Sequence, residues 1–182
     1  MKTRDIVYIG IFSAIIAICS WISVPFTVPF TLQTFAVFLS VLLLGGKYGT
    51  VSVLIYILLG AAGIPVFSGF KGGIGVLLGP TGGYIIGFIA SSLLMWAFEP
   101  LKTKNQTVFP IISMLLGLLV CYLFGTIWFS CVYNNGTDTP ASISMILSWC
   151  VIPFIIPDLI KIFLAFLISR NKALKTILRK DL

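Results

Sequence analysis

The sequence predicts an all-α integral membrane protein with six transmembrane helices and one membrane-embedded domain spanning residues 1–182. Of the 182 residues, 59% are hydrophobic and only 9% are charged, whereas soluble domains average about 25% charged residues. The apolar runs are too long for strands and lack a period of two, which argues against a lipid-facing barrel. Helices satisfy their own backbone hydrogen bonds in lipid, which short open strands cannot do.

The predicted helices follow the apolar runs, which proline, glycine and charged residues separate. We expect membrane helices over residues 6–24, 32–44, 50–62, 84–98, 109–133 and within the last apolar run, 143–168. The second and third runs are short for a hydrocarbon core of about 30 Å, so we expect a tilted helix or a thinned bilayer there. In the last run, we expect a short helix up to about Cys150 and a final membrane helix that begins near Pro157.

The basic residues predict that both ends of the chain lie in the cytoplasm. With the N-terminus inside, ten of the twelve fall in cytoplasmic segments: Lys2, Arg4, Lys47, Lys102, Lys104, Arg170, Lys172, Lys175, Arg179 and Lys180. Lys71 falls outside, and Lys161 lies within the last helix. Because cytoplasmic loops are enriched in lysine and arginine, this asymmetry supports six spans rather than an odd number.

Several function classes are excluded by residues that the sequence lacks. It has no histidine and four cysteines, none of them in a C-x-x-C pair, so neither a metal site nor a disulfide framework is expected. Without histidine or a carboxylate pair we expect no acid–base set, and hence no enzyme. The glycines are not followed by Gly-Lys-Ser/Thr, so no nucleotide site is expected. We also expect no cofactor and no nucleic acid.

Asp158 and Lys161 are the first candidates for a ligand site. They lie three residues apart, on one face of a helix, in the otherwise apolar stretch 152–168. A charge in a membrane helix costs at least about 2.5–3.5 kcal/mol, so such residues usually face a cavity or a partner. Two alternatives remain: the residues only pair with each other, or Pro157 begins the helix and Asp158 caps it.

A glycine-rich stretch over residues 63–83 is the second candidate. Glycine permits unusual backbone angles and close approach to a ligand, and the aromatic residues offer flat apolar faces, so the stretch is a candidate lid. The expected ligand contacts here are Phe67, Phe70, Gly72, Gly73, Thr81, Gly82, Gly83 and Tyr84. The alternatives are a flexible connector or a tight contact between helices.

Two further groups of residues lie near the predicted first loop and in the first helix. Thr31 and Gln33 enter an apolar helix and are candidates for ligand hydrogen bonds, although helix capping by Thr31 together with one interhelical hydrogen bond explains them equally well. Small residues at Gly10 and Ala14, and at Ser13 and Ala17, permit close helix packing, either within the protein or against a partner subunit.

Four motifs occur along the chain in a recognisable order: Pro29-Phe-Thr-Leu-Gln-Thr-Phe35, Gly60-Ala-Ala-Gly-Ile-Pro-Val-Phe67, Gly79-Pro-Thr-Gly-Gly-Tyr84 and Pro157-Asp-Leu-Ile-Lys161. Together they resemble the BioY family, the biotin-binding S components of energy-coupling factor (ECF) transporters. The resemblance extends over nearly the whole chain, in order and at similar length. Each motif alone is weak, but together they are specific.

The resemblance implies a substrate-binding domain of six helices, with a vitamin pocket near the outer face of the bacterial cytoplasmic membrane. It implies a high-affinity biotin-capture subunit whose partners are a membrane coupling subunit and two cytoplasmic ATPase subunits. In the family, an Ala-x-x-x-Ala motif of the first helix faces the coupling subunit, and Gly10 replaces its first alanine here. The alternatives are an S component for another small vitamin and a stand-alone carrier or channel.

Biotin, once implied, suggests roles for the candidate residues. We expect Lys161 to pair with the carboxylate of biotin, and Asp158 to accept hydrogen bonds from its ureido group. In the alternative arrangement, Asp158 only orients Lys161, and Lys71 binds the carboxylate. The rings of Phe67, Phe70 and Tyr84 are expected to cover the bicycle.

Overall fold

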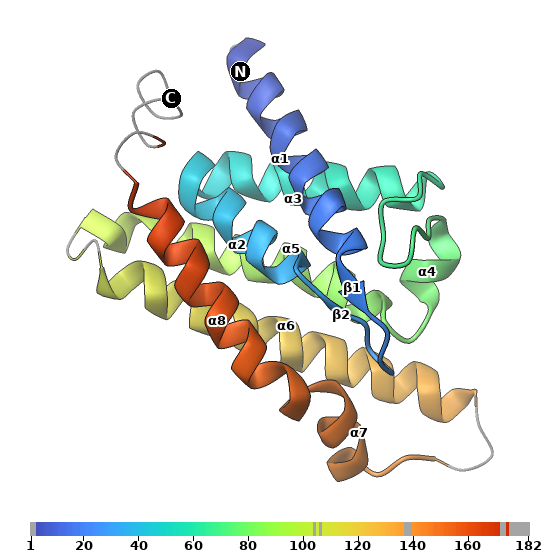
Figure 1. Cartoon of the computed structure of the whole chain (residues 1–182). Coiled ribbons are helices and arrows are strands. Elements are labelled where there is room, and N and C mark those ends of the chain that lie inside the picture. The colour runs from blue at the N-terminus through green and yellow to red at the C-terminus, as the bar shows by residue number, and fades with distance from the viewer. Residues whose placement is uncertain (1–2, 104, 106, 137–139, 172–173, 175–182) are drawn as a thin grey trace.

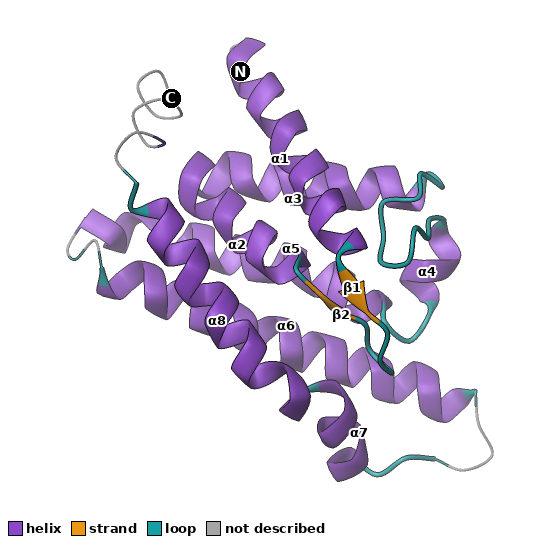
Figure 2. Ribbon diagram, in the orientation of Figure 1, coloured by secondary structure: helices purple, strands orange, loops and turns teal. Residues whose placement is uncertain are grey.

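The apolar runs form helices in the computed structural model of the chain, which describes residues 3–103, 105, 107–136, 140–171 and 174 (Figure 1; Figure 2). The helices are α1 (Thr3–Trp21), α2 (Gln33–Leu44), α3 (Gly46–Ala61), α4 (Ile74–Leu78), α5 (Gly82–Ala97), α6 (Val108–Asn135), α7 (Ile143–Cys150) and α8 (Ile152–Ser169). A 3₁₀ helix, η1 (Glu99–Thr103), follows α5. Two short strands, β1 (Ser23–Val24) and β2 (Phe30–Thr31), connect α1 to α2.

Among the described residues, four helical segments are long and apolar enough to cross a membrane, namely Thr3–Trp21, Gly82–Leu101, Val108–Asn135 and Ile143–Ser169. The protein is therefore an all-helical, multi-pass membrane protein. The apolar helices α2 and α3 have only 12 and 16 residues, or about 18 and 24 Å at 1.5 Å per residue. Both are shorter than a hydrocarbon core of about 30 Å, and the expected tilt or bilayer thinning stays a prediction, as do the six crossings.

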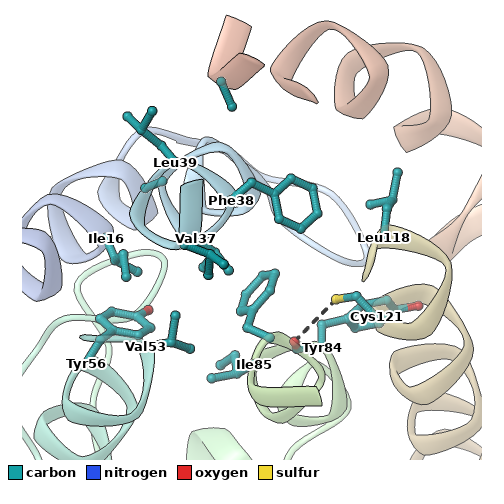
Figure 3. Close-up of a cluster of buried hydrophobic side chains, with 14 of the residues drawn as sticks. Ile16, Val37, Phe38, Leu39, Val53, Tyr56, Tyr84, Ile85, Leu118 and Cys121 are labelled. Atoms are coloured by element: carbon teal, nitrogen blue, oxygen red, sulfur yellow. Dashed lines mark hydrogen bonds between the residues drawn. The ribbon is translucent and has the colours of Figure 1, made fainter. Parts of the chain in front are cut away.

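The short helix α2 lies at the centre of the bundle. Eleven of its twelve residues are buried, because α1, α3, α5 and α8 surround it. In Figure 3, Val37 of α2 points toward Val53 of α3, and the ring of Phe38 points toward Leu118 of α6. A helix shielded on all sides needs no polar face, which explains why this run is apolar around its whole circumference.

Small residues allow neighbouring helices to approach closely. A Cβ atom at Gly83 would overlap the side chain of Trp128, and one at Gly125 would overlap the ring of Tyr84. Both contacts join α5 to α6. Such glycine contacts are typical of helix packing in membranes.

The segment between α1 and α2 is a β-hairpin rather than an irregular break. Strands β1 and β2 are antiparallel, with Ser23 opposite Thr31 and Val24 opposite Phe30. The hairpin was not predicted, because strands of two residues leave no periodic pattern in the sequence. The short helix α4 in the glycine-rich stretch was missed for a similar reason.

The expected start of the last helix near Pro157 was wrong. Helix α8 begins at Ile152, with Pro153 in its first turn and Pro157 inside it. Asp158 therefore lies in the second turn and does not cap the helix. Six of the basic residues used to predict the orientation lie outside the described residues, namely Lys2, Lys104, Lys172, Lys175, Arg179 and Lys180.

Candidate ligand-binding cavity

A cavity of about 360 Å³ opens at one end of the bundle. Its walls come from the β-hairpin, the loop before α4, and helices α2, α4, α5, α6, α7 and α8. This volume is within the range of about 300–1,000 Å³ usual for sites that bind small molecules. The cavity brings together segments that are far apart in the sequence. The chemistry of the side chains that line it indicates which ligand it suits.

The polar floor of the cavity is a buried network on α6 and α8. Lys161 Nζ donates to Asp158 Oδ1 over 2.7 Å, and both side chains are 4% exposed. Tyr122 Oη donates to Asp158 Oδ2 over 2.5 Å. The carboxylate and the ammonium have opposite charges, so the floor is neutral overall. It is nevertheless rich in hydrogen-bonding groups.

Aromatic side chains form the apolar walls. Phe67 is 1% exposed, and its ring meets the Tyr56 ring edge-on with centroids 5.6 Å apart. Tyr84 projects from α5, and its hydroxyl lies 3.1 Å from Thr126 Oγ1. Phe88 and other apolar side chains complete the walls. Flat apolar surfaces of this kind suit a small ring system.

Lys71 supplies an exposed cation among the residues that line the cavity. Its backbone pairs with Phe67 in both directions: Phe67 N–H donates to Lys71 C=O over 2.9 Å, and Lys71 N–H donates to Phe67 C=O over 3.3 Å. This bridge closes a tight turn and holds Lys71 beside the aromatic wall. An anionic group of a ligand with its other end on the floor would find its counter-charge here.

Most of the predicted ligand residues meet in this cavity. Seven of the twelve line it: Thr31, Gln33, Phe67, Thr81, Tyr84, Asp158 and Lys161. Besides Asp158, Lys161 and Tyr84, two more of these have partners within the protein: Gln33 Nε2 donates to Tyr56 Oη over 2.9 Å, and Thr31 Oγ1 accepts from Gln33 N–H over 3.2 Å.

The other five predicted ligand residues lie outside the set that lines the cavity, and each has a structural explanation. Gly82 and Gly83 begin α5, and a Cβ atom there would overlap Leu77 and Trp128. Gly72 lies against the backbone of Ile64, and Gly73 has a φ of 98°. Phe70 is 65% exposed and stacks on Trp21, with centroids 5.0 Å apart. These residues shape the loop and the helix contacts.

The small residues of α1 divide between two faces. Ser13 and Ala17 are buried, and Ser13 Oγ donates to the carbonyl of Ser52 in α3 over 2.8 Å. Gly10 and Ala14 are exposed. Ser13 and Ala17 therefore pack within the protein, whereas Gly10 and Ala14 lie on the uncovered face of α1.

Comparison with known proteins identifies the family. Residues 1–179 match the model of the BioY family. The chain belongs to the BioY family. It is 41% identical over 167 residues to the "Biotin transporter BioY" of Thermotoga maritima, covering 91% of this chain and 94% of that protein. It is 40% identical over 172 residues to the "Probable biotin transporter BioY" of Pyrococcus horikoshii, covering 94% of this chain and 97% of that protein.

A solved structure supports the same assignment. It is described as the S-component for biotin from an ECF-type ABC transporter, and it matches with a TM-score of 0.82 at 30% identity over 93% of each chain. The resemblance to the BioY family deduced from the four sequence motifs is thus confirmed. These relatives are transporters, in agreement with the expectation of a protein that is neither an enzyme nor dependent on a cofactor.

Sequence reasoning missed several residues of this BioY cavity. Tyr122 binds Asp158 from α6, and Phe154 and Cys150 line the wall near α8. Aromatic and cysteine residues are common in membrane helices, so nothing in the sequence distinguishes these from lipid-facing ones.

Proposed function

We propose that this chain is the biotin-capture subunit, or S component, of an ECF-type importer. The observation that carries the proposal is the cavity with a neutral polar floor, an aromatic wall and one exposed cation, in a chain whose relatives are biotin transporters. Biotin has a neutral ureido ring at one end, an apolar bicycle and a carboxylate at the other. The three parts of the cavity match this order.

We assign the ureido ring to the floor and the carboxylate to Lys71. The charge of Lys161 is already neutralised by Asp158 at 2.7 Å, so a second carboxylate there would add an unbalanced negative charge in a dry site. A ureido group instead offers two N–H donors and one acceptor, which suit a carboxylate beside an ammonium. This assignment favours Lys71 over Lys161 as the partner of the carboxylate.

Biotin amide tests the assignment because it removes only the negative charge of the ligand. We expect the parent chain to prefer biotin to its amide by about tenfold, the effect of a hydrogen bond to a charged group. Lys71→Gln should bind both equally, whereas Lys47→Gln, which alters an exposed lysine of α3, should keep the preference. A preference that is lost only in Lys161→Met would instead place the carboxylate on the floor.

We propose six membrane crossings with both ends of the chain in the bacterial cytoplasm. The distribution of lysine and arginine supports this orientation. In Figure 1, the α2–α3 turn and η1 lie on the upper left, and the β-hairpin and α7 lie on the lower right, as alternating crossings require. The cavity then opens toward the outside, where biotin is captured.

We propose that the partners are a membrane coupling subunit and two cytoplasmic ATPase subunits. Described as an S-component of an ECF-type ABC transporter, the structural neighbour supports such an assembly. The exposed residues Gly10 and Ala14 offer a smooth strip on α1 where a helix of the coupling subunit can approach.

Uptake of labelled biotin tests this function and separates the alternatives. Bacteria that lack biotin uptake should accumulate biotin when they express this chain with a coupling subunit and ATPases, and excess thiamin or riboflavin should not compete. Competition by another vitamin would indicate a different substrate. Accumulation of biotin by vesicles that contain this chain alone would indicate a stand-alone carrier.

A further inference from the structure

The ammonium of Lys161 has a second partner besides Asp158. Lys161 Nζ lies 4.1 Å from the centroid of the Phe30 ring, well within the distance of about 6 Å at which a ring face attracts a cation. Phe30 belongs to strand β2 of the hairpin, and its ring also contacts the Phe154 ring, with centroids 6.1 Å apart. A residue of the outer hairpin thus reaches the buried charge pair.

The hydrogen-bonding capacity of the ammonium shows why this contact matters. A lysine ammonium has three N–H donors. One of them points to Asp158 Oδ1, and the cation lies over the Phe30 ring. A cation over a ring face directs a second N–H at the ring, so the two contacts fix the direction of the head group and leave one donor for a ligand in the cavity. Without the ring, the head group would be free to rotate about its bond to Asp158.

We propose that Phe30 is a positioning residue for ligand binding, whose ring face orients the Lys161 ammonium toward the ligand. This inference rests on the proposed function, because the ligand in question is biotin. It also links the hairpin to the floor of the cavity, since the same ring belongs to β2 and touches the cation on α8. A ligand that takes the remaining donor of Lys161 therefore binds to a head group that is already oriented.

A graded weakening of the negative potential on the Phe30 ring face tests the proposal with little change in the shape of the side chain. Replacing Phe30 by phenylalanine with one, two or three ring fluorines weakens the negative ring face step by step. We expect the affinity for biotin to fall with each fluorine, reaching about a tenfold loss, which equals about 1.4 kcal/mol. Phe30→Trp should retain the affinity, and Phe30→Leu should lower it.

The same fluorinated series at Phe129 is the matched control, because that ring is 1% exposed, stacks on Tyr133 and is absent from the cavity lining. An affinity that declines at position 30 but stays level at position 129 supports the proposal, and a level series at position 30 overturns it. If the parent chain binds no biotin, the proposed function fails separately. The melting temperatures of the ligand-free variants then test whether the Phe30 ring holds the Lys161 ammonium. A stepwise fall in melting temperature at position 30 supports this contact, and constant melting temperatures overturn the proposal.

Discussion

Replacing Asp158 by asparagine should lower both the stability and the ligand affinity. The substitution leaves the Lys161 ammonium, at 4% exposure, without the carboxylate that lies 2.7 Å away. Removing one partner of a buried ion pair costs about 3–5 kcal/mol. For a chain of this length each kcal/mol lowers Tm by about 2–4 °C, so a drop of about 6–20 °C is expected.

Removing both charges separates the two effects. In Asp158→Asn with Lys161→Met no charge is left buried, and replacing a buried ion pair by apolar groups is often neutral or stabilising. We therefore expect Tm to return to the parent value or above. The affinity should stay lost, because removing a charged partner of the ligand costs about 2–5 kcal/mol, or roughly 30-fold to 4,000-fold.

The assay combines thermal unfolding in detergent with calorimetric titration of biotin. Asp5→Asn is the control, since Asp5 is also a buried carboxylate but accepts from Tyr48 over 3.1 Å, and Asp5 is absent from the cavity lining. Its biotin affinity should equal that of the parent chain. The reasoning is refuted if Asp158→Asn melts within 2 °C of the parent, taken as the smallest shift expected for about 1 kcal/mol, or if the double variant melts as low as the single one.

Other positions give further expected outcomes. Gly83→Ala should lower Tm by several degrees, because its Cβ atom would overlap Trp128, whereas Gly75→Ala has nothing within 4 Å and should not; equal melting would refute the packing role. Gly10→Leu should keep biotin binding but prevent copurification with the coupling subunit. Bound biotin should protect Cys150, which lines the cavity, from a mercurial, but not the exposed Cys131, as measured by mass spectrometry; equal labelling would contradict the site.

The helices were predictable because lipid imposes a strong rule on the sequence. In lipid a chain must satisfy its backbone hydrogen bonds internally, which a helix does. Each apolar run, from that of α1 to that of α6, therefore forms a helix. The start of α8 was misjudged because Pro157 was taken as a helix start. A proline is also tolerated inside a membrane helix, where its neighbours can satisfy the freed backbone groups, and α8 begins five residues earlier, at Ile152.

The charged residues of the site were predictable, but its aromatic residues were not. Asp158 and Lys161 stand out because a charge in lipid is costly, and both line the cavity. Phe30 and Tyr122 belong to a chain with 14% aromatic residues, so only the fold shows which of them reach the floor. Glycines were misread for a related reason: Gly83 serves helix packing, and its sequence context does not distinguish this from contact with a ligand.

Calorimetric titration of biotin into the detergent-purified chain tests the central claim most directly. We expect saturable binding with one site per chain and a nanomolar Kd, which corresponds to about −12 kcal/mol. The affinity should survive in Asp5→Asn and be lost in Asp158→Asn. A folded chain that shows no saturable binding of biotin would contradict the claim that this cavity captures biotin.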